Sequence, residues 1–266
     1  MSSTSPNISK KKRVITCLFD HCKRVDNLEF DTDLVREISR EIGFKNIYDV
    51  TKIDQSEKLP EEVRNAGYCI AGLGRGYYKF IKGLDVWYHR FEPIAENEVV
   101  PWPYKPSLLN HIDDSESNII SLVYNQRIIQ HFLYEDITQS PKMYMSRRTK
   151  VTASYCVDEE TINAEKLQAE IDATFEHNGE VTILEAKNGS PDDFSVYQLF
   201  HPFLVYHNMG IEGIKKIECC YLLRDKGKSI VSLYLYSFSD IKDMQSIRLI
   251  KKSTYNLAAR NDESSS

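Results

Sequence analysis

Three ionisable residues around one predicted hairpin carry the strongest chemical signal in this sequence. The dipeptide Asn178-Gly179 separates two largely apolar segments, and it favours a two-residue hairpin turn because both of its positions accept positive φ. Counting outward from that turn places Asp172 directly opposite Glu185. Lys187 lies two residues beyond Glu185 and therefore points to the same face of its strand. The hairpin thus brings two carboxylates and one ammonium group to a single place.

This combination predicts a divalent metal site. Two facing carboxylates repel each other, and the apolar run Thr182-Ile183-Leu184 predicts a strand that is buried on both faces. A cation between Asp172 and Glu185 would remove the repulsion, and oxygen donors suit Mg²⁺, which also keeps waters and phosphate oxygens. A lysine beside the metal can orient a water molecule or offset charge that develops on a phosphate. The alternative is a solvated strand face that carries a cross-strand ion pair.

The same residues resemble a known nuclease motif. Asp172, a hairpin, and then Glu185-Ala186-Lys187 are similar to the core of the PD-(D/E)XK nuclease superfamily. The following Asn188-Gly189 and a helix that holds Gln198 resemble type II restriction endonucleases. The proline that often precedes the aspartate is replaced by Ile171, which is a departure at the loosest letter of the motif. The resemblance covers approximately residues 108–240.

The resemblance implies a specific activity. It predicts a Mg²⁺-dependent, sequence-specific endonuclease that hydrolyses phosphodiester bonds of double-stranded DNA, as type II restriction enzymes do. Asp172, Glu185 and the Ala186 carbonyl would bind Mg²⁺, and Lys187 would orient or activate the attacking water. Cutting both strands of a symmetric site needs two active sites, so we expect a homodimer. A companion DNA methyltransferase would belong to the same system without being a physical partner.

Two further residues are expected to support the site. Glu116 begins a predicted helix that Asp114 or Ser115 caps, and in nucleases of this kind an early helix often supplies another carboxylate. The helix dipole offers an alternative explanation for an acid at that position. Glu135 is the second choice for the additional carboxylate. Gln198 is expected to face the active site from its helix, with a plain surface amide as the alternative.

The fold expected for the C-terminal part is α/β (α+β). A long helix is predicted from residue 115 to residue 133, and a helix bent at Pro202 is predicted from 194 to 206. Strands are predicted around the following ranges: 149–157, 167–175, 180–187, 217–223 and 230–238. This alternation predicts a mixed central sheet flanked by helices, in a restriction-endonuclease-like core.

The N-terminal part is expected to be a winged-helix-like DNA-contacting domain. A helix capped by Asp31 or Thr32 and ended by Gly43 precedes two short helices, over residues 45–53 and from Pro60 to Gly67. Two strands then surround the glycine-rich segment 72–76, which would form the wing. A structural hairpin with a glycine turn is the alternative.

The proline-rich segment 101–106 marks the predicted domain boundary. Three prolines in six residues cannot continue a helix or a central strand. We therefore expect a disordered tail over 1–12, the winged-helix-like domain over 13–105, the nuclease domain over 106–260 and a second disordered tail over 261–266.

The charge balance limits how the chain could hold DNA. Its 266 residues carry a net charge of −5, so DNA binding would need local basic surfaces. The predicted DNA-binding residues are the two basic groups Arg75 with Lys79 and Arg147-Arg148 with Lys150. Each group could equally be a solvated surface.

The composition limits the class of protein and the cellular location that fit this chain. The chain has 41% hydrophobic and 27% charged residues, which is typical of a globular protein, and it has no apolar run of membrane-spanning length. Six scattered cysteines and the weak signal-like character of the N-terminus favour a cytoplasmic location. Two other functions stay open: a repair or mobile-element nuclease of the same superfamily, and a DNA-binding regulator without catalytic activity.

Overall fold

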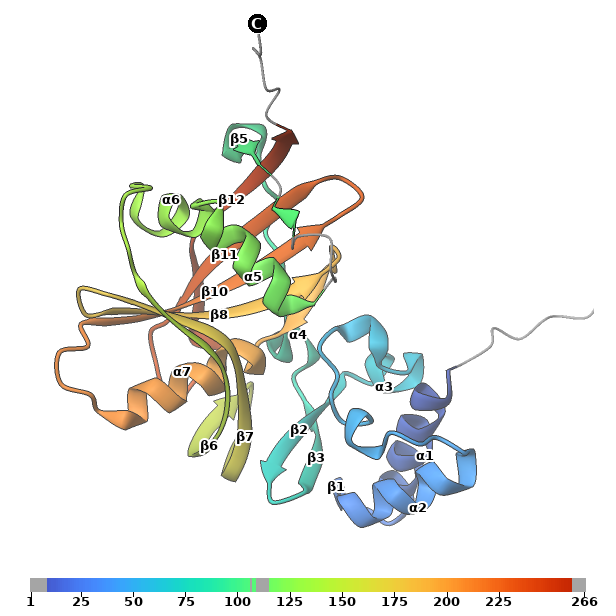
Figure 1. Ribbon diagram of the computed structural model, residues 1–266. Helices are drawn as coiled ribbons and strands as arrows, with labels where there is room; N and C mark the ends of the chain where they lie inside the picture. Colours follow the sequence, from blue (N-terminus) through green and yellow to red (C-terminus); the bar gives the residue numbers. More distant parts are fainter. Residues whose placement is uncertain (1–8, 106, 109–114, 260–266) are drawn as a thin grey trace, which may run out of the picture.

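A computed structural model of the protein describes residues 9–105, 107–108 and 115–259. The chain forms a small N-terminal unit and a large mixed sheet flanked by helices (Figure 1). The mixed sheet predicted from the sequence is therefore confirmed. No helix in the described ranges is long and apolar enough to cross a membrane.

The large sheet has seven strands in the order β5-β12-β11-β10-β8-β7-β6. Their bounds are Val99–Tyr104 (β5), Lys142–Val157 (β6), Glu160–His177 (β7), Glu180–Asn188 (β8), Lys216–Asp225 (β10), Ile230–Phe238 (β11) and Ile247–Ala259 (β12). Strand β8 runs parallel to β10, β12 runs parallel to β5, and the other neighbours are antiparallel. Strand β12 was not predicted.

Helices cover both faces of this sheet (Figure 1). The helices α5 (Glu116–Asn125) and α6 (Ile128–Tyr134) share one buried apolar cluster with residues of β7, β8, β10, β11 and β12. Helix α7 (Tyr197–Met209) packs on the opposite face and contacts β6, β7, β8 and β10. The single long helix predicted over 115–133 is wrong, because Arg127 adopts a left-handed conformation with φ of 62° and divides it into α5 and α6. Helix α7 continues through Pro202.

The predicted hairpin forms with the predicted turn. Asn178 has φ of 53° and Gly179 has φ of 87°, and the β7–β8 ladder runs from His177 opposite Glu180 to Ala173 opposite Leu184. Beyond that pair the two strands separate, since β7 stays paired with β6 while β8 stays paired with β10 up to Asn188. The strands therefore part at the position of Asp172 and Glu185.

The N-terminal unit combines helices with a three-stranded sheet of order β1-β3-β2. Its elements are α1 (Lys10–Arg24), β1 (Glu29–Asp31), α2 (Thr32–Ile42), the 3₁₀ helices η1 (Ile47–Asp49) and η2 (Ser56–Lys58), α3 (Glu61–Asn65), β2 (Tyr68–Gly74) and β3 (Tyr77–Lys82). The caps predicted for α2 are confirmed: Asp31 accepts from two backbone N–H groups, and Gly43 has φ of 71°.

Helix α1 corrects the prediction of a tail over residues 1–12. The Ser9 side chain accepts from the Lys12 backbone N–H, and the helix begins at Lys10. Its apolar side chains, among them Val14 and Leu18, are completely buried, so the basic run at its start is the first turn of a packed helix. The parts of the two predicted tails at residues 1–8 and 261–266 lie outside the described residues.

The proline-rich segment is a strand and not a linker. Strand β5 pairs with β12 along its whole length, as the last strand at one edge of the large sheet. Proline is tolerated there because an edge strand leaves one row of N–H positions unpaired. The predicted boundary between residues 105 and 106 is therefore too late, because residues 99–104 belong to the C-terminal sheet.

Three short elements join the two parts of the chain. Helix α4 (Leu84–Trp87) leads into β4 (Tyr88–Arg90), which pairs with β9 (Asp193–Ser195) in a two-stranded sheet. The 3₁₀ helices η3 (Glu96–Glu98) and η5 (Met244–Ser246) flank β5 and β12. Strand β4 thus ties the segment after the N-terminal unit to the strand that precedes α7.

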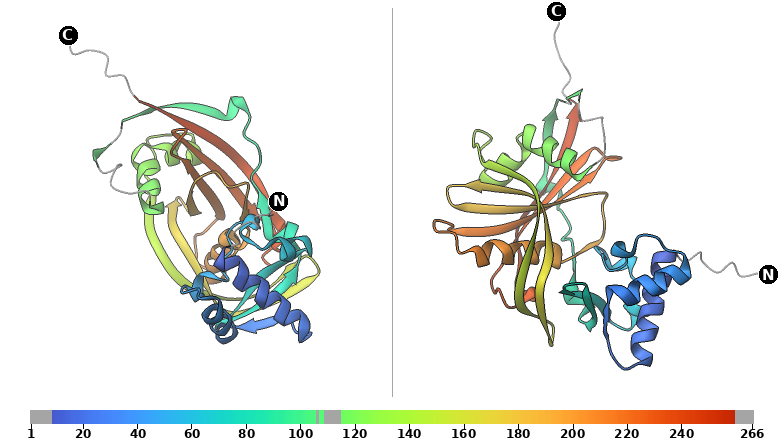
Figure 2. Two further views of the ribbon diagram at one scale, coloured as in Figure 1. Left: turned by 90° about the vertical axis from the view of Figure 1, so that its right-hand side faces the viewer. Right: turned by 60° about the horizontal axis from the view of Figure 1, so that its bottom comes forward.

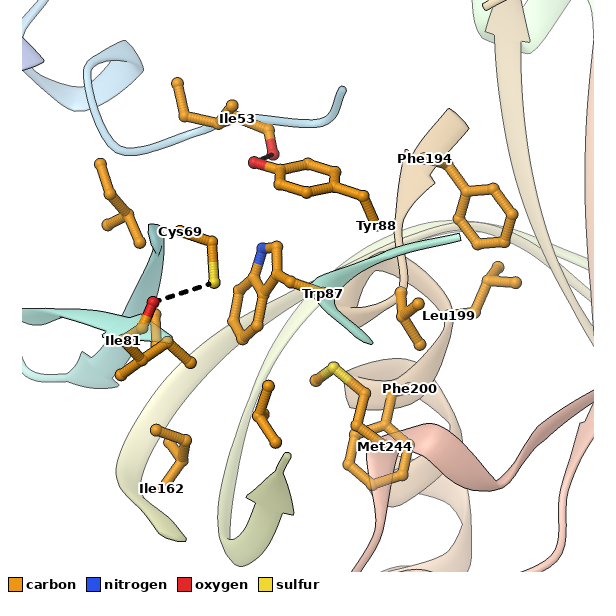
Figure 3. Packing of buried hydrophobic residues seen from close by; sticks show 14 of the residues in the cluster. Ile53, Cys69, Ile81, Trp87, Tyr88, Ile162, Phe194, Leu199, Phe200 and Met244 are labelled. Atoms are coloured by element: carbon orange, nitrogen blue, oxygen red, sulfur yellow. Dashed lines mark hydrogen bonds between the residues drawn. The ribbon is translucent and has the colours of Figure 1, made fainter. Parts of the chain in front are cut away.

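One apolar core extends across the junction (Figure 3). Ile53 and Cys69 of the N-terminal unit lie in the same buried cluster as Trp87, Phe194 and Leu199. Polar contacts reinforce this junction: the Ser195 backbone N–H donates to the Asp54 carbonyl at 2.8 Å, and the Tyr88 hydroxyl donates to the Ile53 carbonyl at 3.3 Å. The N-terminal unit is therefore fixed against the sheet.

The glycine-rich segment 72–76 serves packing. The β2–β3 hairpin lies against β7, at the end of the long β6–β7 hairpin (Figures 1 and 2). A Cβ on Gly74 would overlap the carbonyl oxygen of Glu165, so only glycine permits this approach. The close backbone approach that these glycines permit is made toward β7.

Candidate active site

A cavity of about 880 Å³ lies between the N-terminal unit and the large sheet. The N-terminal unit contributes three lysines to its lining, and the sheet contributes the three residues of the predicted motif. These residues are Lys11, Lys52, Lys58, Asp172, Glu185 and Lys187. The structure therefore brings the predicted motif to the wall of one cleft.

The backbone holds Asp172 at the point where β7 and β8 part. The Ala186 backbone N–H donates to Asp172 Oδ2 at 2.9 Å, so a side-chain contact continues the strand pairing where the ladder ends. Residues 181–186 of β8 are all buried, as the apolar run predicts. Asp172 and Glu185 are thus fixed beside each other, with Glu185 buried and Asp172 half-buried.

Lys187 bridges two carboxylates. Its Nζ lies 3.0 Å from Glu185 Oε1 and 2.5 Å from Glu116 Oε1. Glu116 is the first residue of α5, where the Ser115 side chain accepts from the Asn118 backbone N–H. Glu116 therefore joins the site as predicted, and Asp114, the other expected cap, lies outside the described residues.

The second choice, Glu135, lies elsewhere. It follows the last residue of α6 and has φ of 55°, and it does not line the cleft. Its place at the far end of the α5–α6 pair explains the difference, because only the start of α5 reaches the point where the strands separate.

Gln198 links Glu185 on β8 to Tyr221 on β10. Its Nε2 donates to Glu185 Oε1 at 2.7 Å, and its Oε1 accepts from the Tyr221 hydroxyl at 3.3 Å. The expectation that Gln198 faces the site is therefore confirmed. Tyr221, on β10, was missed, because nothing in the sequence distinguishes it among 16 tyrosines. This chain of hydrogen bonds fixes the orientation of the Glu185 carboxylate.

Burial and like charge make both carboxylates poor anions. Burial raises the pKa of Glu185 to about 8, with Asp172 and Glu116 adding to the rise and Lys187 opposing it. Burial also raises the pKa of Asp172, against the Ala186 N–H and the Lys187 ammonium. For Lys187, burial disfavours the charged form, but Glu185 and Glu116 outweigh it and raise the pKa. The site is therefore deficient in positive charge even with its lysine in place.

The donor set suits a hard cation that keeps other ligands. In the part of the chain that the structure describes, no three His, Cys, Asp or Glu side chains come together to hold a metal ion alone. Mg²⁺ does not require such a cage, since one or two carboxylates commonly bind it together with waters and substrate phosphates. Asp172, Glu185 and the Ala186 carbonyl fit that pattern.

The predicted DNA-binding residues separate into two groups. Arg148 lines the cleft, and Arg147 lines an adjoining hollow of about 470 Å³ that also includes Asp172. Lys150 is exposed on β6, two residues from Arg148 and therefore on the same strand face.

The second group pairs with β7. Arg75 forms an ion pair with Glu165, and Lys79 forms one with Glu160 at 2.9 Å. Arg147, Arg148 and Lys150 thus lie near the site, whereas Arg75 and Lys79 fasten the β2–β3 hairpin to β7.

Three other basic residues of the N-terminal unit lie toward the candidate site, where contacts by Arg75 and Lys79 were expected. Lys11, Lys52 and Lys58 line the cleft from the N-terminal unit. No sequence signal marks Lys52 and Lys58, which stand singly, and the run that contains Lys11 resembles a tail. Only the packing of the two parts of the chain brings these lysines toward Asp172.

The chain matches two families over adjoining segments. Residues 12–80 match a domain of unknown function, DUF6996, and residues 85–256 match another domain of unknown function, DUF6997. The two matches meet near α4, where the N-terminal unit ends, and the second contains Glu116, Asp172, Glu185, Lys187 and Gln198. No curated protein and no solved structure matches the chain. Because the second match covers more than half of its residues, the chain belongs to the DUF6997 family.

Proposed function

We propose that this protein is a Mg²⁺-dependent endonuclease that hydrolyses phosphodiester bonds in double-stranded DNA, of the type II restriction kind. One observation carries the proposal: two carboxylates, the half-buried Asp172 and the buried Glu185, lie where β7 and β8 part, with Lys187 paired to Glu185 beside them. A cluster of this kind is costly in a folded chain unless a cation or substrate completes it.

The architecture around the motif supports this assignment. The aspartate stands on β7, the Glu185-Ala186-Lys187 segment stands on the adjacent antiparallel β8, and β10 runs parallel to β8. The helices α5 and α7 cover opposite faces of the sheet and each contributes one side chain to the site. A mixed sheet flanked by helices is the fold that the resemblance to PD-(D/E)XK nucleases implies.

The bound metal would be held by Asp172, Glu185 and the Ala186 carbonyl, and it would supply charge to the phosphate and acidify a bound water. Lys187 presents its ammonium group toward the same space and would orient the attacking water or stabilise charge on the phosphate. Gln198 keeps Glu185 in its orientation, and Glu116 holds Lys187 from the other side.

The N-terminal unit is proposed to be a winged-helix-like DNA-contacting domain. Its element order, with α1, β1, α2, α3 and then β2 and β3, and its sheet order β1-β3-β2 are in keeping with that fold. DNA contacts are proposed for Arg147, Arg148 and Lys150. Contacts by Arg75 and Lys79 would require their ion pairs with β7 to open. A homodimer and a companion methyltransferase remain part of the proposal.

Incubation of the purified protein with phage DNA, with Mg²⁺ and with EDTA, tests the function. Discrete fragments that form only with Mg²⁺ support a sequence-specific nuclease, and their ends give the recognition site. Nicks that depend on DNA structure instead of sequence would replace restriction by repair or mobile-element processing. Binding in a gel shift without cleavage of methylated or unmethylated DNA would favour a non-catalytic regulator and contradict the proposal.

A further inference from the structure

One charged cluster in the cleft lies outside the motif. Glu170 Oε1 accepts hydrogen bonds from Lys52 Nζ and Gln168 Nε2, each at 2.9 Å, and it forms an ion pair with Arg148 Nε at 3.3 Å. The side chains remain accessible, with exposed fractions of 56% for Lys52, 42% for Glu170 and 76% for Arg148. An oxyanion that is paired with a lysine and an arginine together has the partners that a phosphate oxygen commonly has.

This cluster lies beside Asp172 on the same face of β7. Glu170 and Asp172 are two residues apart on β7, so both side chains point to the same face, about 6–7 Å apart along the strand. That separation is close to the distance between neighbouring phosphates in one nucleic-acid strand. The large cleft and the adjoining hollow share Arg148, Glu170, Asp172 and Glu116 in their linings, so they form adjoining spaces on either side of the site.

Lys52 is held in place by the junction between the two parts of the chain. The segment that follows it is anchored to β9, since the Ser195 hydroxyl donates to the Ile53 carbonyl at 2.5 Å and the Ser56 backbone N–H donates to Asp193 at 2.9 Å. The other two cleft lysines pair within the N-terminal unit, Lys11 with Asp49 at 3.0 Å and Lys58 with Asp54 at 2.7 Å. Lys52 is distinguished from them because its partner belongs to β7.

We infer that Lys52 and Arg148 form a subsite for the nucleic-acid phosphate next to the one at Asp172, and that Glu170 occupies this subsite until the backbone enters. The inference rests on the proposed function for the nature of the ligand. An accessible ion pair contributes little to stability, so exchanging Glu170 for a phosphate oxygen costs the fold little. The subsite draws one cation from each part of the chain, so substrate would contact both.

Binding of a random-sequence DNA duplex in EDTA, measured by fluorescence anisotropy over a salt series, tests the inference without any cleavage step. Lys52→Ala and Arg148→Ala should each weaken binding about five- to tenfold and reduce the salt slope by about 1, which is the signature of one lost phosphate contact. Glu170→Gln should strengthen binding several-fold, because it removes a competing anion while it keeps the shape of the side chain.

The other end of the same strand pair offers matched controls. Lys142 and Glu176 face each other across β6 and β7, as Arg148 and Glu170 do, and their side chains lie 3.1 Å apart. Lys142→Ala and Glu176→Gln should leave both the affinity and the salt slope unchanged.

The outcomes separate this inference from the proposed function. If Glu170→Gln weakens binding or leaves it unchanged, the cluster only ties the two parts of the chain together and the inference is wrong. Absence of DNA binding by the wild-type protein also overturns it. Binding with the expected variant pattern but no cleavage with Mg²⁺ supports the subsite and contradicts the nuclease.

Discussion

Two polar clusters share helix α7, and they differ in charge. Gln198 belongs to the cluster of Glu185, Lys187 and Glu116, whereas His201, one turn later, forms a 2.8 Å hydrogen bond with the Tyr155 hydroxyl. Burial lowers the pKa of His201 to about 3 and raises that of Tyr155, so this second pair is neutral at pH 7. Helix α7 therefore contributes to one cluster that is neutral and hydrogen-bonded, and to another whose charges are not balanced within the chain.

This difference distinguishes a polar cluster that serves only the fold from a polar cluster that is suited to a function. A neutral hydrogen-bonded pair is the ordinary way to bury polar atoms, and it needs nothing from outside the chain. The carboxylates beside Lys187 remain poor anions despite their hydrogen bonds, which is an arrangement that folding alone does not favour. The charged cluster is therefore the place to look for chemistry, and the neutral pair is its internal control.

The largest effect is expected from removing the ammonium group of Lys187. Lys187→Ala should abolish DNA cleavage, a loss of at least the order of 10²–10³-fold, because the water or phosphate then lacks its positively charged partner. DNA binding in EDTA should persist, since Lys52 and Arg148 are untouched. Digestion of phage DNA with Mg²⁺, beside a gel shift without it, measures both quantities.

Lys142→Ala is the matched control for that experiment. Lys142 also pairs with a glutamate on β7, but its side chain is 73% exposed, and ion pairs of this kind contribute little to stability. The variant should cut DNA as the wild type does. Retained cleavage by Lys187→Ala, in protein that melts as a folded chain, would contradict the catalytic assignment.

The neutral pair predicts a dependence of stability on pH. The pKa of His201 is about 3 in the folded state, below the unfolded value of about 6.5, so its contribution is present above pH 6.5 and is lost as the pH falls. Between pH 7 and pH 5 this loss amounts to about 2 kcal/mol. Urea unfolding of the wild type and of His201→Gln at both pH values should show that the variant lacks this part of the pH dependence.

His207 serves as the comparison on the same helix. It is exposed two turns further along α7, so His207→Gln should keep the pH dependence of the wild type. An equal pH dependence in wild type and His201→Gln would mean that His201 takes up a proton within the fold, and the contrast between the two clusters would fail.

The parts that could be predicted from the sequence depend on local signals. The Asn178-Gly179 turn fixes the register of β7 and β8, and the register alone brings Asp172 beside Glu185 and Lys187. The caps of α2 were equally readable, because a cap is decided within a few residues. Glu116 and Gln198 could be named only through the family resemblance.

The rest depends on contacts between distant segments. Tyr221 reaches Gln198 because β10 lies beside β8, and Lys52 reaches Glu170 across 118 positions of the sequence. The proline-rich strand β5 was taken for a boundary because proline excludes a central strand but not an edge strand, and only the sheet shows which it is. No short pattern encodes such partners.

The smallest effect expected is a gain in stability. Asp172→Asn should stabilise the metal-free protein by about 1 kcal/mol at pH 7, because the raised pKa of Asp172 means that its ionised form is disfavoured in the fold while an amide is not. Asparagine can still accept from the Ala186 N–H. For a chain of this size each kcal/mol corresponds to about 2–4 °C in the melting temperature, which thermal unfolding in EDTA resolves.

Glu176, the acid at the other end of β7, should behave in the opposite way. The hydrogen bond from Lys142 lowers the pKa of Glu176, so Glu176→Gln removes a favourable interaction and should not raise the melting temperature. Adding Mg²⁺ should then stabilise the wild type but not Asp172→Asn, since only the wild type keeps both carboxylates for the ion. A lower melting temperature for Asp172→Asn in EDTA would mean that Asp172 is needed as a structural partner of the Ala186 N–H, and the argument that this carboxylate is kept for function at the expense of stability would fail.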